Sequence, residues 1–326
     1  MMATCGRTPN PKVAAVVCTI LGHRGASART TSAHEVARCV EALLSNSYTP
    51  LEVIVVDQSP HDAVAAALRP LCEADVRLRY IHTHIHGLTR SQNRAVKSSD
   101  AEVFAFTDDD CIVPTDWVER IVETFRRRPD AGLLFGDVRP PAGHDWATSF
   151  VPELHFPQEE PLRPSFLPRV HSLMGANMAV RRETFARIGL LEEAFGARPY
   201  NGEVELALRA LRTRPPIGVY LTPAFHVVHE YGSRPQGKPA QRLLRTYHMG
   251  KSAMLTTHAL HGDLGAACKL GLLAFEPFVE GAVNLVRTGK PRGAGMIVPY
   301  VEGIIRGLPA ARRSGGRPLS AEEQEP

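Results

Sequence analysis

The strongest constraint on the fold of this chain is the order of its apolar segments. From Val13 to Arg127, short runs rich in β-branched residues alternate with longer stretches of helical periodicity. This β-α-β-α order predicts an α/β fold, with a mainly parallel, Rossmann-like sheet flanked by helices. The predicted strands are Val13–Ile20, Leu51–Val56, Arg77–His82 and Glu102–Phe106, and the predicted helices are Ala33–Asn46, Asp62–Glu73, Leu88–Ser98 and Pro114–Arg127.

Composition is consistent with such a fold. The chain has 326 residues, of which 44% are hydrophobic and 22% charged, so it can bury a substantial core. Its six cysteines lie far apart without a CxxC pair, which argues against a zinc knuckle or a disulfide framework and favours a reducing cytoplasm. Residues 1–12 lack the apolar core of a signal peptide, and we expect them to form a flexible N-terminus of the mature chain.

Three consecutive carboxylates, Asp108, Asp109 and Asp110, follow the fourth predicted strand in the segment VFAFTDDDCIVP. Like charges this close repel one another unless something neutralises them. In a doubly wound sheet, ligands bind beyond the carboxyl ends of the strands. A hard divalent cation, Mg²⁺ or Mn²⁺, suits this position because it prefers oxygen ligands and often bridges carboxylates and phosphates. A solvated turn or helix cap is the alternative.

Five ordered segments carry a resemblance to a known family. They are VAAVVCTILGHR, EALLSNSYTPLEVIVVDQSP, GLTRSQNRAVKSSDAEVFAFTDDDCIVPTDW, GANMAVRRETFARIG, and GEVELALR followed by FHVVHEYGS. From about residue 13 to about residue 232, the chain resembles a family 2 glycosyltransferase of the GT-A fold. The resemblance implies a metal-dependent, inverting transfer of a sugar from a nucleotide-sugar donor to a hydroxyl acceptor. It also implies Mn²⁺ or Mg²⁺ as cofactor and a UDP-sugar as the commonest donor.

The resemblance implies a nucleotide site at the strand ends. A carboxylate at the end of the second strand would accept a hydrogen bond from the imide or amide N–H of the base. The alternatives are an ordinary turn residue at that strand end and ordinary helix initiation at the start of GLTRSQNRA. The residues assigned to the nucleotide are Thr19, Arg24, Asp57, Gly87, Arg90, Asn93 and Asp108.

The family's DxD motif is matched by Asp108 and Asp110. The resemblance implies that Asp110 binds the metal and that Asp108 binds the ribose or the metal; a register in which Asp109 is the ligand stays open. His229 matches a histidine that many such enzymes direct at the metal or the diphosphate, and imidazole suits Mn²⁺ better than Mg²⁺. A buried structural histidine is the alternative. The ion would act as a Lewis acid on phosphoryl oxygens.

A carboxylate is also expected as the base that takes the proton of the acceptor hydroxyl. The family places it two residues before an acid-Leu-x-x-Arg segment, which here begins at Glu205, so Glu203 is the expected base. The position before it holds Gly202, where the family often has another acid, and Glu is longer than Asp by one methylene. Glu205 is the alternative base, although a carboxylate there also suits a helix N-terminus. The resemblance places Gly175, Asn177 and Glu205 near the donor or acceptor sugar, while a tight turn equally explains Gly175.

Outside these motifs, seven prolines between Arg139 and Val170 predict a long loop over 139–170 within a domain spanning 13–232. Residues 233–313 are predicted to form a basic, amphipathic, helical appendage: Gly232 to Arg313 holds twelve Lys and Arg against four acids. Its apolar runs fall short of the roughly 20 nearly uncharged residues of a spanning helix. Its helices are expected either to lie on an anionic membrane surface or to pack on the catalytic domain or a second subunit. Residues 314–326 are predicted to be disordered.

These features predict the partners of the chain: a nucleotide-sugar donor, a saccharide or lipid-linked acceptor such as a cell-envelope glycan, and a membrane surface, but no nucleic acid. The expected localisation is the cytoplasm, with a peripheral position on the inner face of the cell membrane as the variant. Two other functions stay open. A nucleotidyltransferase is one, because ILGHRGASAR offers glycines and Arg24 after the first strand. A non-catalytic nucleotide-sugar-binding or membrane-docking protein is the other, because of the departure at Gly202 and Glu203.

Overall fold

The computed structural model describes residues 9–22, 31–167, 173–193, 201–275 and 297–313. Its strands are β1 Val13–Thr19, β2 Leu51–Asp57, β3 Leu78–His82, β4 Val103–Asp108, β5 Ala131–Arg139, β6 Ser149–Phe150, β7 Glu160–Pro161, β8 Asn177–Arg181, β9 Gly218–Val228 and β10 Arg234–Pro235. Its helices are α1 Ala33–Leu44, α2 Ala63–Ala74, α3 Leu88–Lys97, α4 Trp117–Arg127, α5 Arg182–Ile188, α6 Gly202–Arg212, α7 Lys238–Leu260 and α9 Ile297–Arg313, and 264–275 is also helical. The four strands and four helices predicted up to Arg127 are all present.

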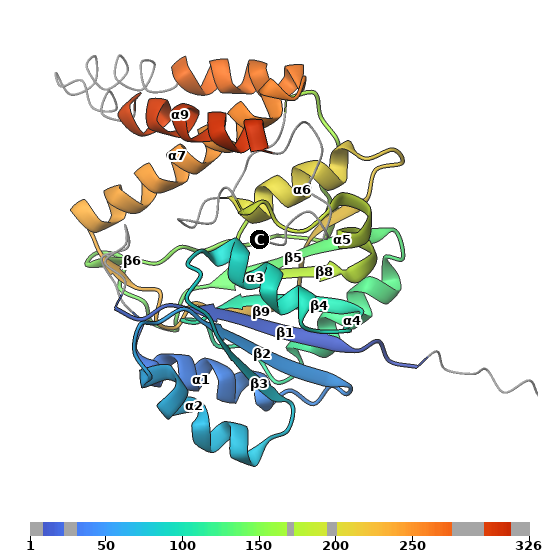
Figure 1. Cartoon of the computed structure of the whole chain (residues 1–326), viewed down its shortest axis with the longest axis vertical. Coiled ribbons are helices and arrows are strands. Elements are labelled where there is room, and N and C mark those ends of the chain that lie inside the picture. The colour runs from blue at the N-terminus through green and yellow to red at the C-terminus, as the bar shows by residue number, and fades with distance from the viewer. Residues whose placement is uncertain (1–8, 23–30, 168–172, 194–200, 276–296, 314–326) are drawn as a thin grey trace, which may run out of the picture.

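The central sheet has eight strands in the order β3-β2-β1-β4-β8-β5-β9-β7 within the described residues. Strands β1 to β4 pair in parallel, as do β5 and β9, while β8 lies antiparallel between β4 and β5. Helices cover both faces of this sheet (Figure 1). The expected mainly parallel α/β sheet, with a helical region at the C-terminal end of the chain, is therefore confirmed.

Alternate residues of each central strand supply two separate hydrophobic cores. In β1, Val13, Ala15 and Val17 face a core that includes α1, α2 and α4, whereas Ala14 and Val16 face one that includes α3, α5, α6 and α7. Strands buried on both faces read as continuous apolar runs rather than as alternating ones. This explains why the first half of the sequence displays its strands so clearly.

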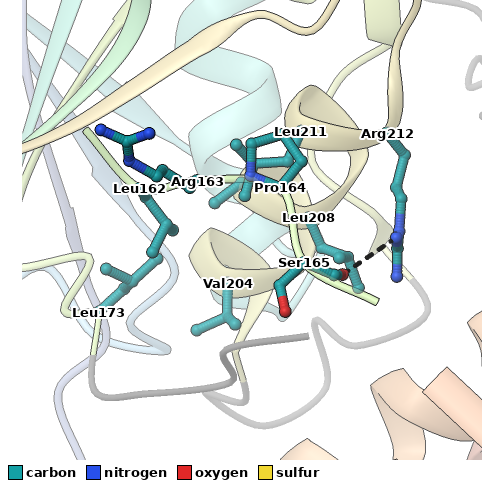
Figure 2. A pocket seen from close by; sticks show the side chains of 10 residues that line it. Leu162, Arg163, Pro164, Ser165, Leu173, Val204, Leu208, Leu211 and Arg212 are labelled. Carbon is teal, nitrogen blue, oxygen red and sulfur yellow. Dashed lines mark hydrogen bonds between the residues drawn. The ribbon is translucent and has the colours of Figure 1, made fainter. Parts of the chain in front are cut away.

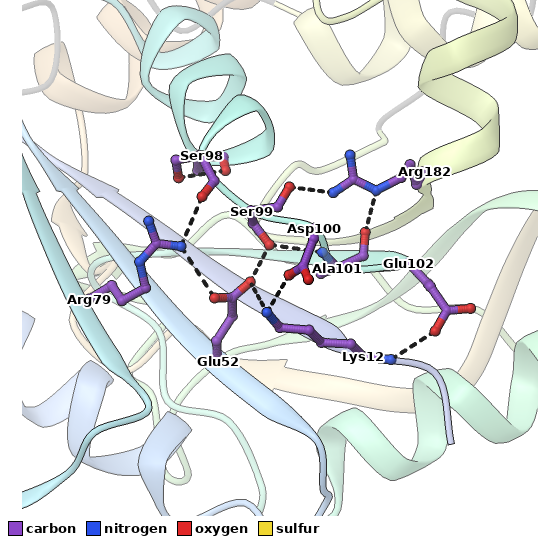
Figure 3. Close-up of polar contacts among 10 residues, drawn as sticks. Lys12, Glu52, Arg79, Ser98, Ser99, Asp100, Ala101, Glu102 and Arg182 are labelled. Carbon is purple, nitrogen blue, oxygen red and sulfur yellow. Dashed lines mark hydrogen bonds and ion pairs between the residues drawn. The ribbon is translucent and has the colours of Figure 1, made fainter. Parts of the chain in front are cut away.

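A polar network ties the amino ends of the strands together, at the edge of the sheet away from the strand ends that carry the carboxylates (Figure 3). The carboxylate of Glu52 in β2 lies 3.5 Å from Lys12 Nζ and 3.3 Å from Arg79 Nη1, and it also accepts from the hydroxyl of Ser99. Its side chain is only 10% exposed. Residues 9–12, assigned above to the flexible N-terminus, therefore contribute at least Lys12 to a defined contact.

Replacing Glu52 by Ala is expected to destabilise the fold by about 1 kcal/mol, because the largely buried carboxylate is the shared partner of the partly exposed Lys12, Arg79 and Ser99 side chains. Thermal unfolding should report a lower Tm, with any enzymatic activity per folded molecule unchanged. The matched control is Glu73→Ala at an exposed position of α2, which should stay within about 0.5 kcal/mol of the unmodified chain. Equal stability of the two variants would show that the network contributes nothing.

The loop predicted over 139–170 is largely irregular, but it contains two short strands that the sequence did not predict. It contributes β6 to a small sheet with β10, and β7 to the edge of the main sheet against β9. Val151 in this loop is fully buried. Residues 168–170 lie outside the described part of the chain.

The C-terminal helices pack closely through glycine. A side chain at Gly303 of α9 would meet Ser252 Oγ at 2.0 Å, and one at Gly307 would meet the Ala253 carbonyl oxygen at 2.5 Å, so α9 lies directly against α7 there. None of the described helices combines the length and the apolar character that a membrane-spanning segment requires. Residues 276–296 of the predicted helical appendage, and all of the tail 314–326, lie outside the described residues.

Candidate active site

The candidate active site is a cavity of about 360 Å³ at the carboxyl ends of the strands. Its walls come from segments far apart in the sequence: the end of β4, the turn before β8, the first turn of α6, the loop before and after β6, and α7. The residues that line it are Leu88, Gln92, Asp108, Trp146, Phe150, Val151, Pro152, Glu153, Leu173, Met174, Gly175, Ala176, Asn201, Glu203, Tyr247, His248 and Lys251.

Strand register brings the first group of predicted residues to this edge. Thr19 pairs with Asp57 across β1 and β2, and the residue before Thr19 pairs with Asp108 across β1 and β4. Asp57 is fully buried, and its carboxylate accepts from the Ser59 backbone N–H at 2.8 Å and the Tyr80 hydroxyl at 2.7 Å. Asp57 is the last residue of β2, as the sequence predicted, and these two hydrogen bonds fix its carboxylate.

The three aspartates have different surroundings. Asp108 faces the cavity, whereas Asp109 points back to Thr19 and Thr31, whose hydroxyls donate to it at 2.6 and 3.2 Å. Loss of solvent and the neighbouring Asp110 charge raise the pKa of Asp108 to about 6 and that of Asp109 to about 7. Because the Asp109 carboxylate already accepts hydrogen bonds from two hydroxyls, the geometry favours Asp108 and Asp110 over Asp109 for ligand binding.

Asp110 lies against His229, which follows β9. The Nε2 atom of His229 lies 3.1 Å from Asp110 Oδ1, and its Nδ1 lies 3.0 Å from the carbonyl oxygen of Pro152. Burial would lower the pKa of His229, but the Asp110 carboxylate outweighs burial and raises it. A carboxylate oxygen and an imidazole nitrogen this close to each other form a donor set that fits a divalent cation such as Mn²⁺.

The two glutamates of the first turn of α6 have opposite environments. Glu203 lines the cavity, and burial together with the nearby Asp108 charge raises its pKa to about 7. Burial would also raise the pKa of Glu205, but Arg209 Nε at 2.7 Å and His258 Nε2 at 3.3 Å outweigh burial and lower it to about 2. Glu205 is thus paired with two basic side chains, while Glu203 lines the cavity with a raised pKa.

The structure also gives a reason for the departure at Gly202. A side chain at this position would come within 2.7 Å of Thr89 Cγ2, where α6 crosses the start of α3. An acid before Glu203 would therefore press α6 away from α3. Asn201, the residue before Gly202, is the N-cap of α6 and has a left-handed backbone conformation with φ of 56°. Asn201 and Glu203, in the first turn of the helix, both line the cavity.

The residues in and before α3 that were assigned to the nucleotide have three different environments. Gly87 is the N-cap of α3, with φ of 138°, and its N–H donates to the side chain of Gln58 beside Asp57. Asn93 is buried and exchanges hydrogen bonds with the backbone of Leu191, at 2.9 and 3.0 Å. Arg90 is partly exposed and lies 3.6 Å from a carboxylate oxygen of Glu193. Arg24 lies outside the described residues.

Of the residues assigned to the sugars, Gly175 and Asn177 differ in placement. Gly175 lines the cavity, and Glu203 lies close to it: a Cβ there would be 3.8 Å from Glu203 Oε2. Asn177 instead lies inside the sheet, where its side chain accepts from Trp117 Nε1 at 2.9 Å and donates to the Asp137 carbonyl at 2.8 Å. Asn177 is fully buried in this network and does not line the cavity.

Sequence reasoning missed the far wall of the cavity. Trp146 and Phe150 come from the proline-rich loop, and Tyr247, His248 and Lys251 come from α7. Tyr247 and Lys251 are four residues apart on one helical face, which is the only signal that could have pointed to them. Burial raises the pKa of Tyr247 to about 12.

A second cavity, of about 20 Å³, lies behind α6 and has room for about one water molecule (Figure 2). Its lining includes Leu162, Leu173, Val204 and Leu208, with Arg212 donating to the carbonyl of Ser165 at 3.3 Å. A cavity of this size is too small to hold a nucleotide or a sugar.

Comparison with known proteins agrees with this geometry. The model of the family described as glycosyl transferase family 2 matches residues 30–189. A glucosyl-dolichyl phosphate glucuronosyltransferase from Haloferax volcanii is 27% identical over 186 residues, covering 55% of each protein. The succinoglycan biosynthesis protein ExoM from Rhizobium meliloti is 32% identical over 108 residues, which cover 32% of this chain and 34% of ExoM. The chain thus spans about half or less of the length of these curated relatives.

Two solved structures share the fold. The mannosyltransferase PcManGT from Pyrobaculum calidifontis, in complex with GDP-Man and Mn²⁺, superposes with a TM-score of 0.55 at 16% identity, covering 92% of this chain and 88% of that one. TarS 1–349 from S. aureus gives 0.56 at 14% identity, covering 91% and 81%. The fold is that of GT-A glycosyltransferases, and residues 30–189 form a glycosyl transferase family 2 domain.

Proposed function

We propose that the chain is an inverting glycosyltransferase that moves a sugar from a nucleotide-sugar donor to a hydroxyl acceptor. The observation that carries this proposal is that one cavity combines a cluster of groups suited to bind a metal ion with a carboxylate suited to accept a proton. Asp108 lines it next to the Asp110–His229 pair, and Glu203, with a pKa of about 7, lines the same cavity from α6. The family match over residues 30–189 supports transfer of a sugar over transfer of a nucleotide.

The reaction needs one base and one departing diphosphate. Glu203 would take the proton of the acceptor hydroxyl as the acceptor oxygen bonds to the anomeric carbon. The bond from that carbon to the diphosphate breaks at the same time, and the nucleoside diphosphate leaves with the bonding electrons. A pKa near 7 suits this role because about half of the carboxylate is ionised at neutral pH, and the ionised form accepts a proton more readily than an ordinary carboxylate.

Asp108, Asp110 and His229 are the residues that would hold a divalent metal ion. A bound Mn²⁺ or Mg²⁺ would supply positive charge to the diphosphate oxygens. The complex of PcManGT with GDP-Man and Mn²⁺ supports this assignment, and that of TarS with UDP-GlcNAc supports a nucleotide-sugar donor. The donor sugar would extend from the strand ends toward Gly175.

The experiment for this function is a panel of nucleotide sugars screened for thermal stabilisation with and without Mn²⁺, followed by donor hydrolysis or transfer with the donor selected. Asp110→Ala is expected to reduce turnover at least about 100-fold, because it removes the central charged partner of His229. The matched control is Asp62→Ala, at an exposed aspartate before α2, which should keep full activity. Metal-independent turnover, or an active Asp110→Ala variant, would contradict the proposal.

We also infer a lipid-linked acceptor presented at the surface of the cytoplasmic membrane. The stripe formed by Val298, Val301, Ile305 and Leu308 of α9 follows helical spacing and is 39 to 69% exposed, on the side away from the glycines that contact α7. The basic charge of residues 232–313 complements anionic lipid. The glucosyl-dolichyl phosphate glucuronosyltransferase of Haloferax volcanii supports a lipid-linked acceptor.

Sedimentation with vesicles tests this surface. The chain is expected to bind vesicles rich in phosphatidylglycerol and to bind neutral phosphatidylcholine vesicles more weakly. The double variant Val301→Gln, Ile305→Gln should reduce binding at least tenfold, because each apolar side chain contributes about 1.5–3 kcal/mol when buried. Val76→Gln is the control, since Val76 is 98% exposed on the loop before β3. Unchanged vesicle binding with loss of a dimer, measured by light scattering, would assign the stripe to a second copy instead.

A further inference from the structure

Three buried side chains of different chemistry meet beside the cavity. Ligand atoms of Asp110, Cys111 and His229 all lie within 4.8 Å of one another. Asp110 Oδ1 lies 3.1 Å from His229 Nε2 and 3.9 Å from Cys111 Sγ. Carboxylate, thiol and imidazole together form a different donor set from the carboxylates and imidazole that the sequence motif supplies.

The separations suit one shared ion. Zinc lies about 2.3 Å from sulfur and about 2.0–2.2 Å from nitrogen or oxygen, so two ligands of one tetrahedral zinc ion stand about 3.3–3.6 Å apart. The separations of 3.1 and 3.9 Å from Asp110 Oδ1 are close to this range, and the ligand atoms of Cys111 and His229 lie within 4.8 Å of each other. Closing the trio around an ion would need only small side-chain movements.

His229 is already oriented as a ligand. Its Nδ1 lies 3.0 Å from the Pro152 carbonyl oxygen, which can only accept, so Nδ1 carries a hydrogen and Nε2 is the ring nitrogen directed toward Asp110, where it could bind a metal ion in place of its own proton. A backbone carbonyl on the second ring nitrogen is the usual arrangement around metal-bound histidine. Cys111 is fully buried in the same core as Cys39 and Trp117, which excludes water from the sulfur side.

We propose that Asp110, Cys111 and His229 form a site for a thiophilic divalent cation, Zn²⁺ by preference, with a fourth position open. Mn²⁺ and Mg²⁺ would use Asp110 and His229 without the sulfur, because hard cations favour oxygen and soft thiolate favours zinc. The two kinds of ion compete for the same two side chains. On binding Zn²⁺, Cys111 forms a zinc–sulfur bond and releases its proton to solvent, with no change of oxidation state.

Cobalt substitution tests the sulfur directly. Co²⁺ bound to a thiolate absorbs in the near ultraviolet by charge transfer from sulfur, whereas Co²⁺ bound to oxygen and nitrogen does not. The unmodified chain should develop this band on titration, Cys111→Ser should lack it, and Zn²⁺ should bind Cys111→Ser at least tenfold more weakly in calorimetry. Cys39→Ser, a nearby buried cysteine that contacts the Asp108 carbonyl, should keep the band. A band that persists in Cys111→Ser would overturn the proposal.

A second measurement stands if Cys111→Ser does not fold. In a chain with Cys5 and the exposed Cys268 replaced by Ser, X-ray absorption of the zinc complex should show sulfur at about 2.3 Å together with imidazole. A shell of oxygen and nitrogen alone would overturn the site. No sugar transfer is measured in either experiment, so their outcome is independent of the proposed glycosyltransferase activity.

Discussion

Glu203→Gln is expected to lower the turnover of sugar transfer by about 10³-fold while leaving the fold and donor binding intact. Glutamine keeps the size of the side chain beside Gly175, but its amide cannot take the proton of the acceptor hydroxyl. General base catalysis is typically worth 10²–10⁴-fold. Steady-state kinetics with the donor selected by thermal stabilisation would give kcat, and the stabilisation itself would report donor binding by the variant.

The same substitution should raise stability in a pH-dependent way. The folded pKa of Glu203, about 7, lies above its ordinary value of 4.5, so its charged form is disfavoured in the folded state. The resulting loss of stability accumulates as pH rises from about 4.5 and is complete above about 7. Glu203→Gln should therefore melt higher than the unmodified chain at pH 8, by up to about 3 kcal/mol in free energy, with a gain that shrinks toward pH 5.

The pH profile of the unmodified enzyme provides an independent check. Because kcat/KM reports ionisation in the free enzyme, it should rise as pH increases through about 7, where Glu203 becomes ionised. A flat profile between pH 5 and 8, together with an active Glu203→Gln variant, would mean that another group is the base.

Sequence alone predicted β1, β2 and β4 because these strands are buried on both faces and read as nearly unbroken apolar runs. Strand β5 was missed, although it is almost entirely buried. It contains Gly132 and Gly136, which disfavour a strand by propensity. Both are needed for tertiary reasons: a side chain at Gly136 would meet Asn177 Nδ2 at 2.3 Å, and one at Gly132 would meet Ile217 Cγ2 at the same distance.

The candidate active site likewise has a part that the sequence predicted and a part that it did not. Residues at strand ends, such as Thr19, Asp57 and Asp108, were predicted to meet because parallel strands in register bring their carboxyl ends to one edge. The wall made by Trp146 and Tyr247 was not, because an irregular loop and a distant helix reach the cavity through tertiary packing that leaves no periodic signal. Asn177 shows the converse: a motif match led to a residue that holds the sheet together.

The ion pair of Glu205 shows how the appended helix is joined to the catalytic domain. Glu205 in α6 lies 2.7 Å from Arg209 on its own helix and 3.3 Å from His258 on α7. Arg209 in turn donates to the Leu190 carbonyl at 2.7 Å, two residues after the end of α5. One carboxylate thus connects three parts of the chain around the helix that carries the candidate base.

Glu205→Gln is accordingly expected to lower stability by about 3–5 kcal/mol, because it leaves Arg209 and His258 without their shared carboxylate in a buried setting. The folded pKa of Glu205, about 2, lies below its ordinary 4.5, so its ionised form stabilises the fold above about pH 4.5, and this contribution is lost as pH falls toward 2. Thermal unfolding at pH 7 should show a Tm lower by roughly 5–10 °C, and the difference from the unmodified chain should shrink between pH 5 and 3. Glu203→Gln, two residues earlier on the same helix, is the matched control and should shift Tm in the opposite direction. If Glu205→Gln instead melts normally but loses turnover, the roles assigned to the two glutamates are reversed.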